Sequence, residues 1–145
     1  MKISTKGRYA TRAMLDLALH TKEGPVQVKD ISERIGVSER YLEQLLGPLR
    51  IAGLVKATRG ARGGFTLSKS PSDIKLSEII QAMEGSMAPV ECVDSAETCS
   101  RSDKCVTREI WSQIKDAIDG ILGSTTLEDM VMRQQVLEMN QGRCQ

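Results

Sequence analysis

Three cysteines lie close together in a hydrophilic stretch of the chain, ECVDSAETCSRSDKC at residues 91–105. Cys92, Cys99 and Cys105 are spaced C-x6-C-x5-C. Cysteine is usually a small buried apolar residue, so three of them in a polar segment indicate a chemical role. Iron–sulfur clusters are held by cysteine thiolates, whereas structural zinc sites use more closely spaced cysteine pairs. The pattern therefore favours an iron–sulfur cluster over zinc.

The same three thiols could instead sense oxidants directly, through sulfenic acid or a disulfide and without iron. Both readings require thiols that start out reduced. No apolar run of the chain is long enough to span a membrane, and charged residues interrupt the apolar run at the N-terminus, unlike a signal peptide. We therefore expect a cytoplasmic protein, a compartment in which thiols stay reduced.

The helix that follows the cysteines should activate the last of them. Apolar residues recur at helical spacing and predict a long helix over 105–122, which Asp103 could cap. Cys105 would then lie in the first turn of that helix. There the helix dipole and the neighbouring Lys104 would lower the pKa of its thiol and favour the thiolate that binds metal.

Nothing in the sequence indicates an enzyme. The glycine-rich stretch GARGG at residues 60–64 lacks the lysine and the spacing of a phosphate-binding loop. The single histidine, His20, has no evident catalytic partner, and no nucleophile elbow is present. We expect a binding protein.

The charges are divided unevenly along the chain. The 145 residues carry a net charge of +1, but residues 1–75 hold 14 Lys and Arg against 7 Asp and Glu, and residues 76–145 hold 6 against 12. A basic front half indicates a polyanionic partner such as DNA.

The basic half has the pattern of a helix-turn-helix. Apolar spacing predicts helices over 5–21 and 28–35, and a third helix that begins after the cap residue Ser38 and runs to residue 52. Gly36 ends the second of these helices, and two helices joined by such a turn form a helix-turn-helix. Pro48 lies inside the third, where we expect a bend or a local break.

A β-hairpin should follow at once, with strands over 54–58 and 64–68. A helix-turn-helix followed by a hairpin is a winged helix. Arg59 and Arg62 stand among glycines at the hairpin tip, where the backbone can approach a groove closely and arginine suits a narrow minor groove.

A recognition helix contacts DNA bases with its N-terminal residues. Gln44 could pair with adenine, Glu43 could accept from cytosine, and Arg40 could contact guanine or phosphate. The start of the first helix could hold phosphates, and its crowded cations suggest an outside anion. Tyr41 could instead belong partly to the core. The candidate DNA-binding residues are Ser4, Thr5, Lys6, Arg8, Tyr9, Ser38, Glu39, Arg40, Tyr41, Glu43, Gln44, Arg59, Gly60 and Arg62.

The acidic half should hold a helix over 76–84, the polar cysteine loop over 86–104, the long helix and a last helix over 127–139. The long helix carries a wide apolar stripe without a mate of similar length. We expect it to pack against its own copy in a symmetric dimer that binds an inverted-repeat operator. The fold class is thus mainly α, a winged helix-turn-helix domain at 1–75 followed by a cluster-loop and dimerisation region at 76–145.

Four stretches resemble a known family: STKGRYATRAMLDLA, ISERIGVSERYLEQLL, LRIAGLVKATRGARGGF, and the cysteine loop running into KCVTREIW. The chain is similar over nearly its whole length to the bacterial iron–sulfur cluster regulator IscR and its relatives, which include nitric-oxide-sensing and cysteine-metabolism regulators. The resemblance implies a dimeric winged helix whose three cysteines bind a cluster, most often [2Fe–2S]. It also implies that Glu43 helps to discriminate operators and that Arg59 enters the minor groove.

The sequence departs from that family at the fourth cluster ligand. Arg108 stands where the iron–sulfur regulator has a histidine, and Arg8 where nitric-oxide-sensing relatives have an acidic residue; guanidinium has no lone pair to donate. The remaining candidates are Thr107, Glu109, His20, Cys144 or an exogenous ligand.

The sequence therefore predicts a dimeric transcriptional regulator whose operator binding is controlled by an iron–sulfur cluster and which regulates iron–sulfur cluster biogenesis. The alternative is a DNA-binding regulator that carries no cluster and either senses redox state through its thiols or controls cysteine metabolism.

Overall fold

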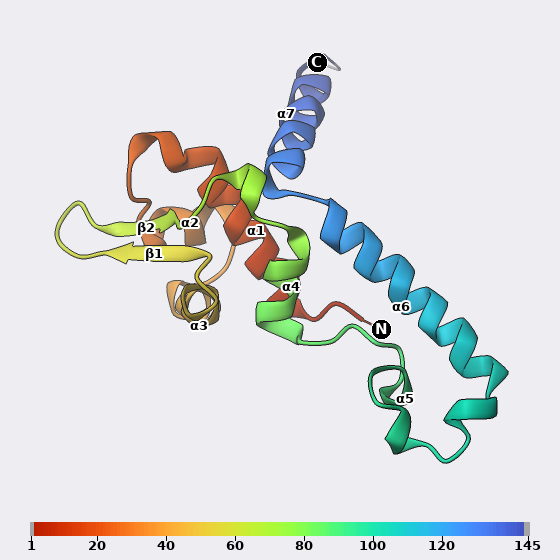
Figure 1. Ribbon diagram of the computed structural model, residues 1–145. Coiled ribbons are helices and arrows are strands. Elements are labelled where there is room, and N and C mark those ends of the chain that lie inside the picture. The colour runs from red at the N-terminus through yellow and green to blue at the C-terminus, as the bar shows by residue number, and fades with distance from the viewer. Residues whose placement is uncertain (1, 144–145) are drawn as a thin grey trace.

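The structure is a computed structural model that describes residues 2–143. The first helix, α1, spans Thr5–His20 and forms the centre of the N-terminal half (Figure 1). Its buried residues recur at helical spacing and face helices α2 and α4. They are Gly7, Ala10, Ala13, Met14, Asp16 and Leu17.

The helix-turn-helix consists of α2, Val28–Ile35, and α3, Glu39–Ile51. Gly36 between them adopts the left-handed conformation, φ 74°, and its N–H donates to the carbonyl of Ser32. Ser38 caps α3, because its hydroxyl oxygen accepts from the Tyr41 N–H at 3.1 Å. Both predicted helices are thus confirmed within one residue.

Helix α3 continues without a break through Pro48. The expected local break is therefore wrong. Proline lacks the N–H that would have bonded one turn back, but Leu45, Leu46 and Leu49 on either side of it are buried in the core. Their packing holds the helix together across the missing bond.

The wing is a two-stranded antiparallel sheet of β1, Val55–Thr58, and β2, Gly64–Leu67, with Val55 opposite Leu67. Phe65 also exchanges backbone hydrogen bonds with Val26, at 2.8 and 2.9 Å. The wing is therefore fixed to the segment that leads into the helix-turn-helix.

The second half begins with α4, Leu76–Glu84, which packs on α1 and α3. Residues 86–105, called the cysteine segment from here on, follow α4. They are not an irregular loop, because they contain a short helix, α5, Glu91–Asp94, and two single helical turns, Ala96–Thr98 and Ser102–Lys104. The segment leads into α6, Val106–Ser124, and then α7, Leu127–Arg143. Ile79 of α4 and Leu127 of α7 belong to the same core as α1, so the hydrophobic core crosses residue 75, while the proposed domain division stays a prediction.

Figure 1 shows how this architecture separates two ends of the molecule. The wing and α3 lie at one end, and the cysteine segment lies at the other, where α6 returns from it to the body. α7 projects from the end of α6. The predicted fold class, a mainly helical winged helix-turn-helix with long C-terminal helices, is confirmed.

Candidate nucleic-acid interface and cysteine segment

Helix α3 presents one polar face to solvent. Glu39, Arg40, Glu43 and Gln44 are exposed, while Leu42 and the other leucines of the helix are buried. The exposed face can contact base edges through side chains of the types that read a major groove. The hydroxyl oxygen of Ser38 is engaged in the helix cap, although Ser38 itself is exposed.

Tyr41 of α3 is half-buried against α1, where its ring meets that of Tyr9 edge to face with 6.1 Å between centroids. The guanidinium of Arg12 lies over the Tyr9 ring at 5.1 Å. The stack places the candidate residues of α1 beside those of α3. Arg12 is one of the crowded cations of the first helix but was not among the predicted DNA-binding residues, although its position three residues after Tyr9 on a helix was the available signal.

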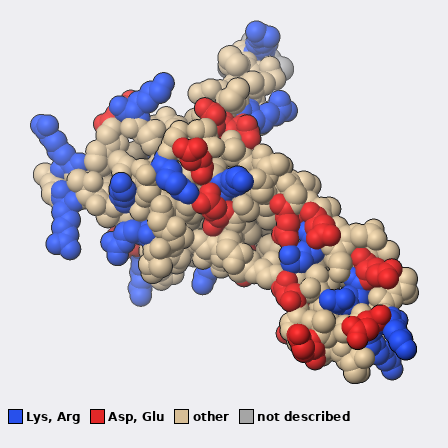
Figure 2. Space-filling view, viewed as in Figure 1, with Lys and Arg blue, Asp and Glu red and all other residues tan. Residues whose placement is uncertain are grey.

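The tip of the wing exposes Arg59, Gly60 and Arg62 together. Gly60 has a φ of 108°, and Gly63 leaves no room for a side chain, since a Cβ there would lie 2.1 Å from the Thr58 carbonyl oxygen. The tight turn directs the two arginines outward. Figure 2 shows mainly basic side chains around this end of the molecule, whereas acidic side chains are frequent toward the cysteine segment.

The start of α1 combines a helix cap with exposed polar and basic side chains. Thr5, Lys6 and Arg8 are exposed and available to phosphates. Ser4, however, caps α1 through its hydroxyl oxygen, and its N–H donates to the Glu84 carboxylate at 2.8 Å. Glu84 thus places a carboxylate at this helix terminus, while the outside anion expected near Lys6 and Arg8 stays a prediction.

The three cysteines of the segment are free thiols of intermediate exposure. Within residues 2–143, no group of three or more His, Cys, Asp or Glu side chains lies close enough together to hold a metal ion. The segment therefore contains three thiols that could bind metal, but the thiols do not lie close together. Cys144, one of the candidate fourth ligands, lies outside the described residues.

Cys105 is the residue that precedes α6, and it occupies the N-cap position. The expected cap, Asp103, lies instead in the single helical turn Ser102–Lys104, so both that cap and the placement of Cys105 in the first turn are wrong. The Thr107 hydroxyl lies 3.1 Å from the Cys105 sulfur. This hydrogen bond is the main cause that lowers the pKa of the Cys105 thiol, with smaller contributions from the N–H of Arg108 and the charge of Arg101.

Arg108 has a structural partner within the cysteine segment. Its Nε donates to the backbone carbonyl of Cys92 at 2.8 Å. Among the candidate fourth ligands, Thr107 is engaged with Cys105, Glu109 is exposed, and the Nδ1 of His20 lies 2.7 Å from the Asp16 carbonyl oxygen at the end of α1. Arg108 thus contacts the first cysteine of the segment, Cys92, and Thr107 contacts the last, Cys105.

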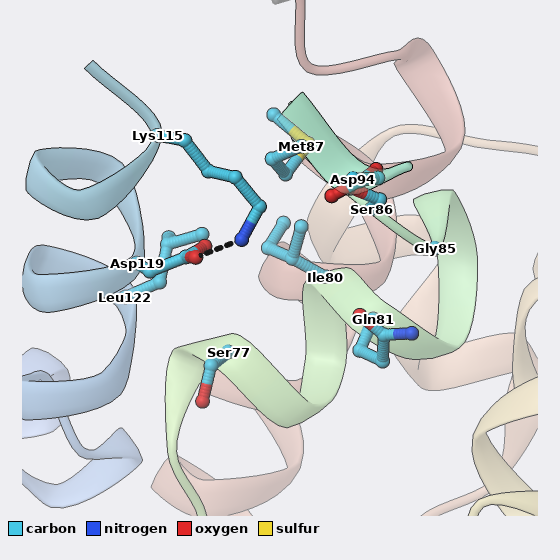
Figure 3. A pocket seen from close by; sticks show the side chains of 10 residues that line it. All are labelled: Ser77, Ile80, Gln81, Gly85, Ser86, Met87, Asp94, Lys115, Asp119 and Leu122. Atoms are coloured by element: carbon cyan, nitrogen blue, oxygen red, sulfur yellow. Dashed lines mark hydrogen bonds and ion pairs between the residues drawn. The ribbon is translucent and has the colours of Figure 1, made fainter. Parts of the chain in front are cut away.

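A cavity of about 280 Å³ lies between α4, the start of the cysteine segment and α6. Figure 3 shows the Lys115 ammonium directed into it, bonded to Asp119 at 2.6 Å, with Asp94 and Met87 on the facing wall. Asp119 and, less strongly, Asp94 raise the pKa of Lys115, which stays cationic.

Helix α6 has one apolar face that the rest of the described chain, residues 2–143, leaves exposed. Leu122 is 9% exposed, whereas Val106, Ile110 and Ile121 are 69%, 47% and 66% exposed. Large apolar side chains of α7 are exposed as well, namely Met132, Val136, Leu137 and Met139. Exposed apolar patches of this kind typically mark an interaction surface.

Among residues 2–143, no helix combines the length and the apolar character that crossing a bilayer requires.

Comparison with known proteins relates this arrangement to a family of regulators. Residues 3–133 match the model of the Rrf2 family, described as an iron-dependent transcriptional regulator. The HTH-type transcriptional regulator IscR of Photorhabdus laumondii is 46% identical over 139 residues, which is 96% of this chain and 84% of the relative. The IscR of Escherichia coli O1:K1 / APEC is 43% identical over 140 residues, 97% and 86% of the two chains.

Solved structures show the same relationship. CymR, described as the global cysteine regulator of B. subtilis, superposes with a TM-score of 0.79 at 44% identity, over 92% of this chain and 98% of that chain. IscR of T. potens superposes with a TM-score of 0.77 at 46% identity, over 92% and 88%. With a family match over residues 3–133 and relatives that align along nearly the whole sequence, the chain belongs to the Rrf2 family and is a DNA-binding transcriptional regulator, not an enzyme.

Proposed function

We propose that the protein is a dimeric, sequence-specific regulator acting in the cytoplasm, whose operator binding is controlled by an iron–sulfur cluster held by Cys92, Cys99 and Cys105. The observation that carries the proposal is the presence of three free, partly exposed thiols on one segment that leads directly into α6. The similarity to IscR proteins supports control of iron–sulfur cluster biogenesis as the physiological role.

The chemical type of the donors fits such a cluster, although the three thiols are not brought together in this structure. Thiolates are its usual ligands, and the lowered pKa of Cys105 favours the thiolate form. When bound, the cluster would supply a group that gains or loses an electron and that is lost under oxidation. Three cysteines leave one coordination position of a [2Fe–2S] cluster to another ligand, which Arg108 cannot provide.

The chain's own contribution is to keep the segment in place. Arg108 ties the carbonyl of Cys92 to the first turn of α6, and Thr107 holds the sulfur of Cys105. The two tethered cysteines bracket Cys99, so the segment is already folded as a loop on the N-terminus of α6.

DNA binding would use the exposed face of α3 for base edges, the turn Thr5–Arg8 of α1 for phosphates, and Arg59 and Arg62 for the minor groove. The exposed stripe of α6 would pair with its own copy and so present two such surfaces to an inverted repeat. Ile110→Asp places a charge in that stripe and should convert the dimer to a monomer in light scattering, with loss of operator binding.

The proposal is tested by anaerobic reconstitution with iron and sulfide. Wild-type protein should become coloured, contain stoichiometric iron and sulfide, and bind its operator differently from the cluster-free form. The variant with all three cysteines changed to alanine should stay a folded, colourless dimer without that difference. Colourless wild-type protein with unchanged operator binding would contradict control by a cluster.

A second candidate is a cluster-free thiol sensor, which the lowered pKa of the partly exposed Cys105 favours, because thiolates react fastest with oxidants. It predicts that peroxide shifts the mass of iron-free protein at Cys105 and changes its operator affinity.

A further inference from the structure

Glu84 joins two segments that are 80 residues apart in the sequence. It is the last residue of α4, and its carboxylate accepts hydrogen bonds from both the N–H and the hydroxyl of Ser4, the residue that caps α1. The Ser4 N–H bond measures 2.8 Å. The Glu84 side chain of α4 thus fixes the position of Ser4, the residue that precedes α1.

The packing around this contact is tight. A Cβ placed on Gly7 would lie 2.5 Å from the Oε1 atom of Glu84 and 3.1 Å from Ile3. Gly7 is buried and is not in a left-handed conformation, so its lack of a side chain is explained by space rather than by backbone geometry. The first turn of α1 leaves room for the Glu84 carboxylate and for little else.

The electrostatics favour the same arrangement. The first turn of α1 contains no acidic residue, while Lys6 and Arg8 add positive charge where the helix dipole is already positive. The half-buried Glu84 carboxylate, which accepts from the Ser4 N–H, places an acceptor at this helix terminus, where the dipole favours one.

We infer that Glu84 is a positioning residue for DNA binding: by holding Ser4 and the Gly7 turn, it fixes where Thr5, Lys6 and Arg8 meet the phosphate backbone. The inference rests on the proposed phosphate-contacting role of that turn. Glu84 is not among the predicted DNA-binding residues, and in this inference it affects DNA binding without contacting the DNA. Gly85, the residue after Glu84, begins the segment that leads to the cysteines. The Glu84–Ser4 contact therefore lies at the boundary between that segment and the proposed DNA-binding half.

The test compares Glu84→Ala with Glu84→Gln on the full-length dimer. Both variants remove the negative charge, but the glutamine oxygen still accepts from Ser4. We expect Glu84→Ala to weaken operator binding about ten-fold, the effect of losing about 1.4 kcal/mol from a charge-assisted contact. Glu84→Gln should retain most of the affinity. A merely structural role would leave the salt dependence of binding unchanged, whereas displaced Lys6 and Arg8 should make its slope shallower.

A double-mutant cycle with Gly7 tests the contact itself. Gly7→Ala in the wild-type background should push the carboxylate away and weaken binding as Glu84→Ala does, but should add little in the Glu84→Ala background. Hydrogen exchange at residues 4–8, with unchanged circular dichroism, separates local release from unfolding. Wild-type affinity and salt slope in Glu84→Ala, or additive losses in the double variant, would overturn the inference. Failure of the wild-type protein itself to bind operator DNA would instead contradict the proposed function.

Discussion

Arg108 donates from Nε to the carbonyl oxygen of Cys92 at 2.8 Å, across the whole length of the cysteine segment. The position that carries a histidine in the resembling iron–sulfur regulator is thus occupied by a side chain that folds the segment and offers no lone pair to a metal. Arg108 therefore holds the cysteine segment in its fold and does not act as a metal ligand.

Arg108→His should therefore remove the hydrogen bond to the Cys92 carbonyl and introduce a side chain that can bind iron. An imidazole at the start of α6 can donate a nitrogen to iron, so the reconstituted cluster should be lost to an iron chelator several-fold more slowly than in wild type. The measurement is the decay of visible absorbance under anaerobic conditions. Arg133→His, on α7, introduces the same side chain away from the segment and should leave the decay unchanged. A decay in Arg108→His no slower than in wild type would show that residue 108 cannot supply the missing ligand.

The reactivity of Cys105 should depend on Thr107. The Thr107 hydroxyl is the main cause that lowers the pKa of the Cys105 thiol, so the thiolate forms at lower pH than in an ordinary cysteine. Alkylation of Cys105 in iron-free protein, followed by mass spectrometry across pH, should show this lowered midpoint. Thr107→Val keeps the shape but removes the hydroxyl, and should raise the midpoint toward the ordinary value. Ser102→Ala is the control, and identical profiles for Thr107→Val and wild type would refute the assignment.

The local structure of this protein is readable from its sequence because local signals agree with one another. Ser38 caps α3, Gly36 ends α2 in the left-handed conformation, and the apolar spacing of α1 matches the residues buried there. In each case the physical cause lies within a few residues of its effect. The winged helix follows from the order of these elements.

Contacts between distant segments were not readable in this way. The Glu84–Ser4 contact joins residues whose side chains carry no pattern that pairs them, and Arg108 is visible in the sequence only as a poor ligand. Pro48 shows the opposite case: a strong local signal for a break is overridden by burial of the neighbouring leucines. Asp103 is a good capping residue by type, but the turn at Ser102–Lys104 moves it away from α6.

Glu43→Ala should alter operator preference more than overall affinity. Glu43 is exposed on α3 and can accept a hydrogen bond from the cytosine amino group in the major groove. Its loss should change discrimination by about 1–3 kcal/mol at the base pair it contacts. Binding should be measured across a panel of base-substituted operators. Glu33→Ala, an equal charge change on the exposed face of α2, should change all affinities alike. The same uniform change in Glu43→Ala would rule out a role in base reading.

Arg59→Ala should weaken binding most on operators whose flanking sequence is A·T-rich. Arg59 is exposed at the tip of the wing, where Gly60 and Gly63 allow a close approach of the backbone, and a narrow A·T-rich minor groove has the strongest negative potential. Lys56→Ala removes the same charge from the exposed face of β1. It should cost a similar amount on every flank, because a lysine that only neutralises phosphate is indifferent to groove width. If Arg59→Ala behaves as Lys56→Ala does on A·T-rich and G·C-rich flanks, the wing contributes charge without reading DNA shape.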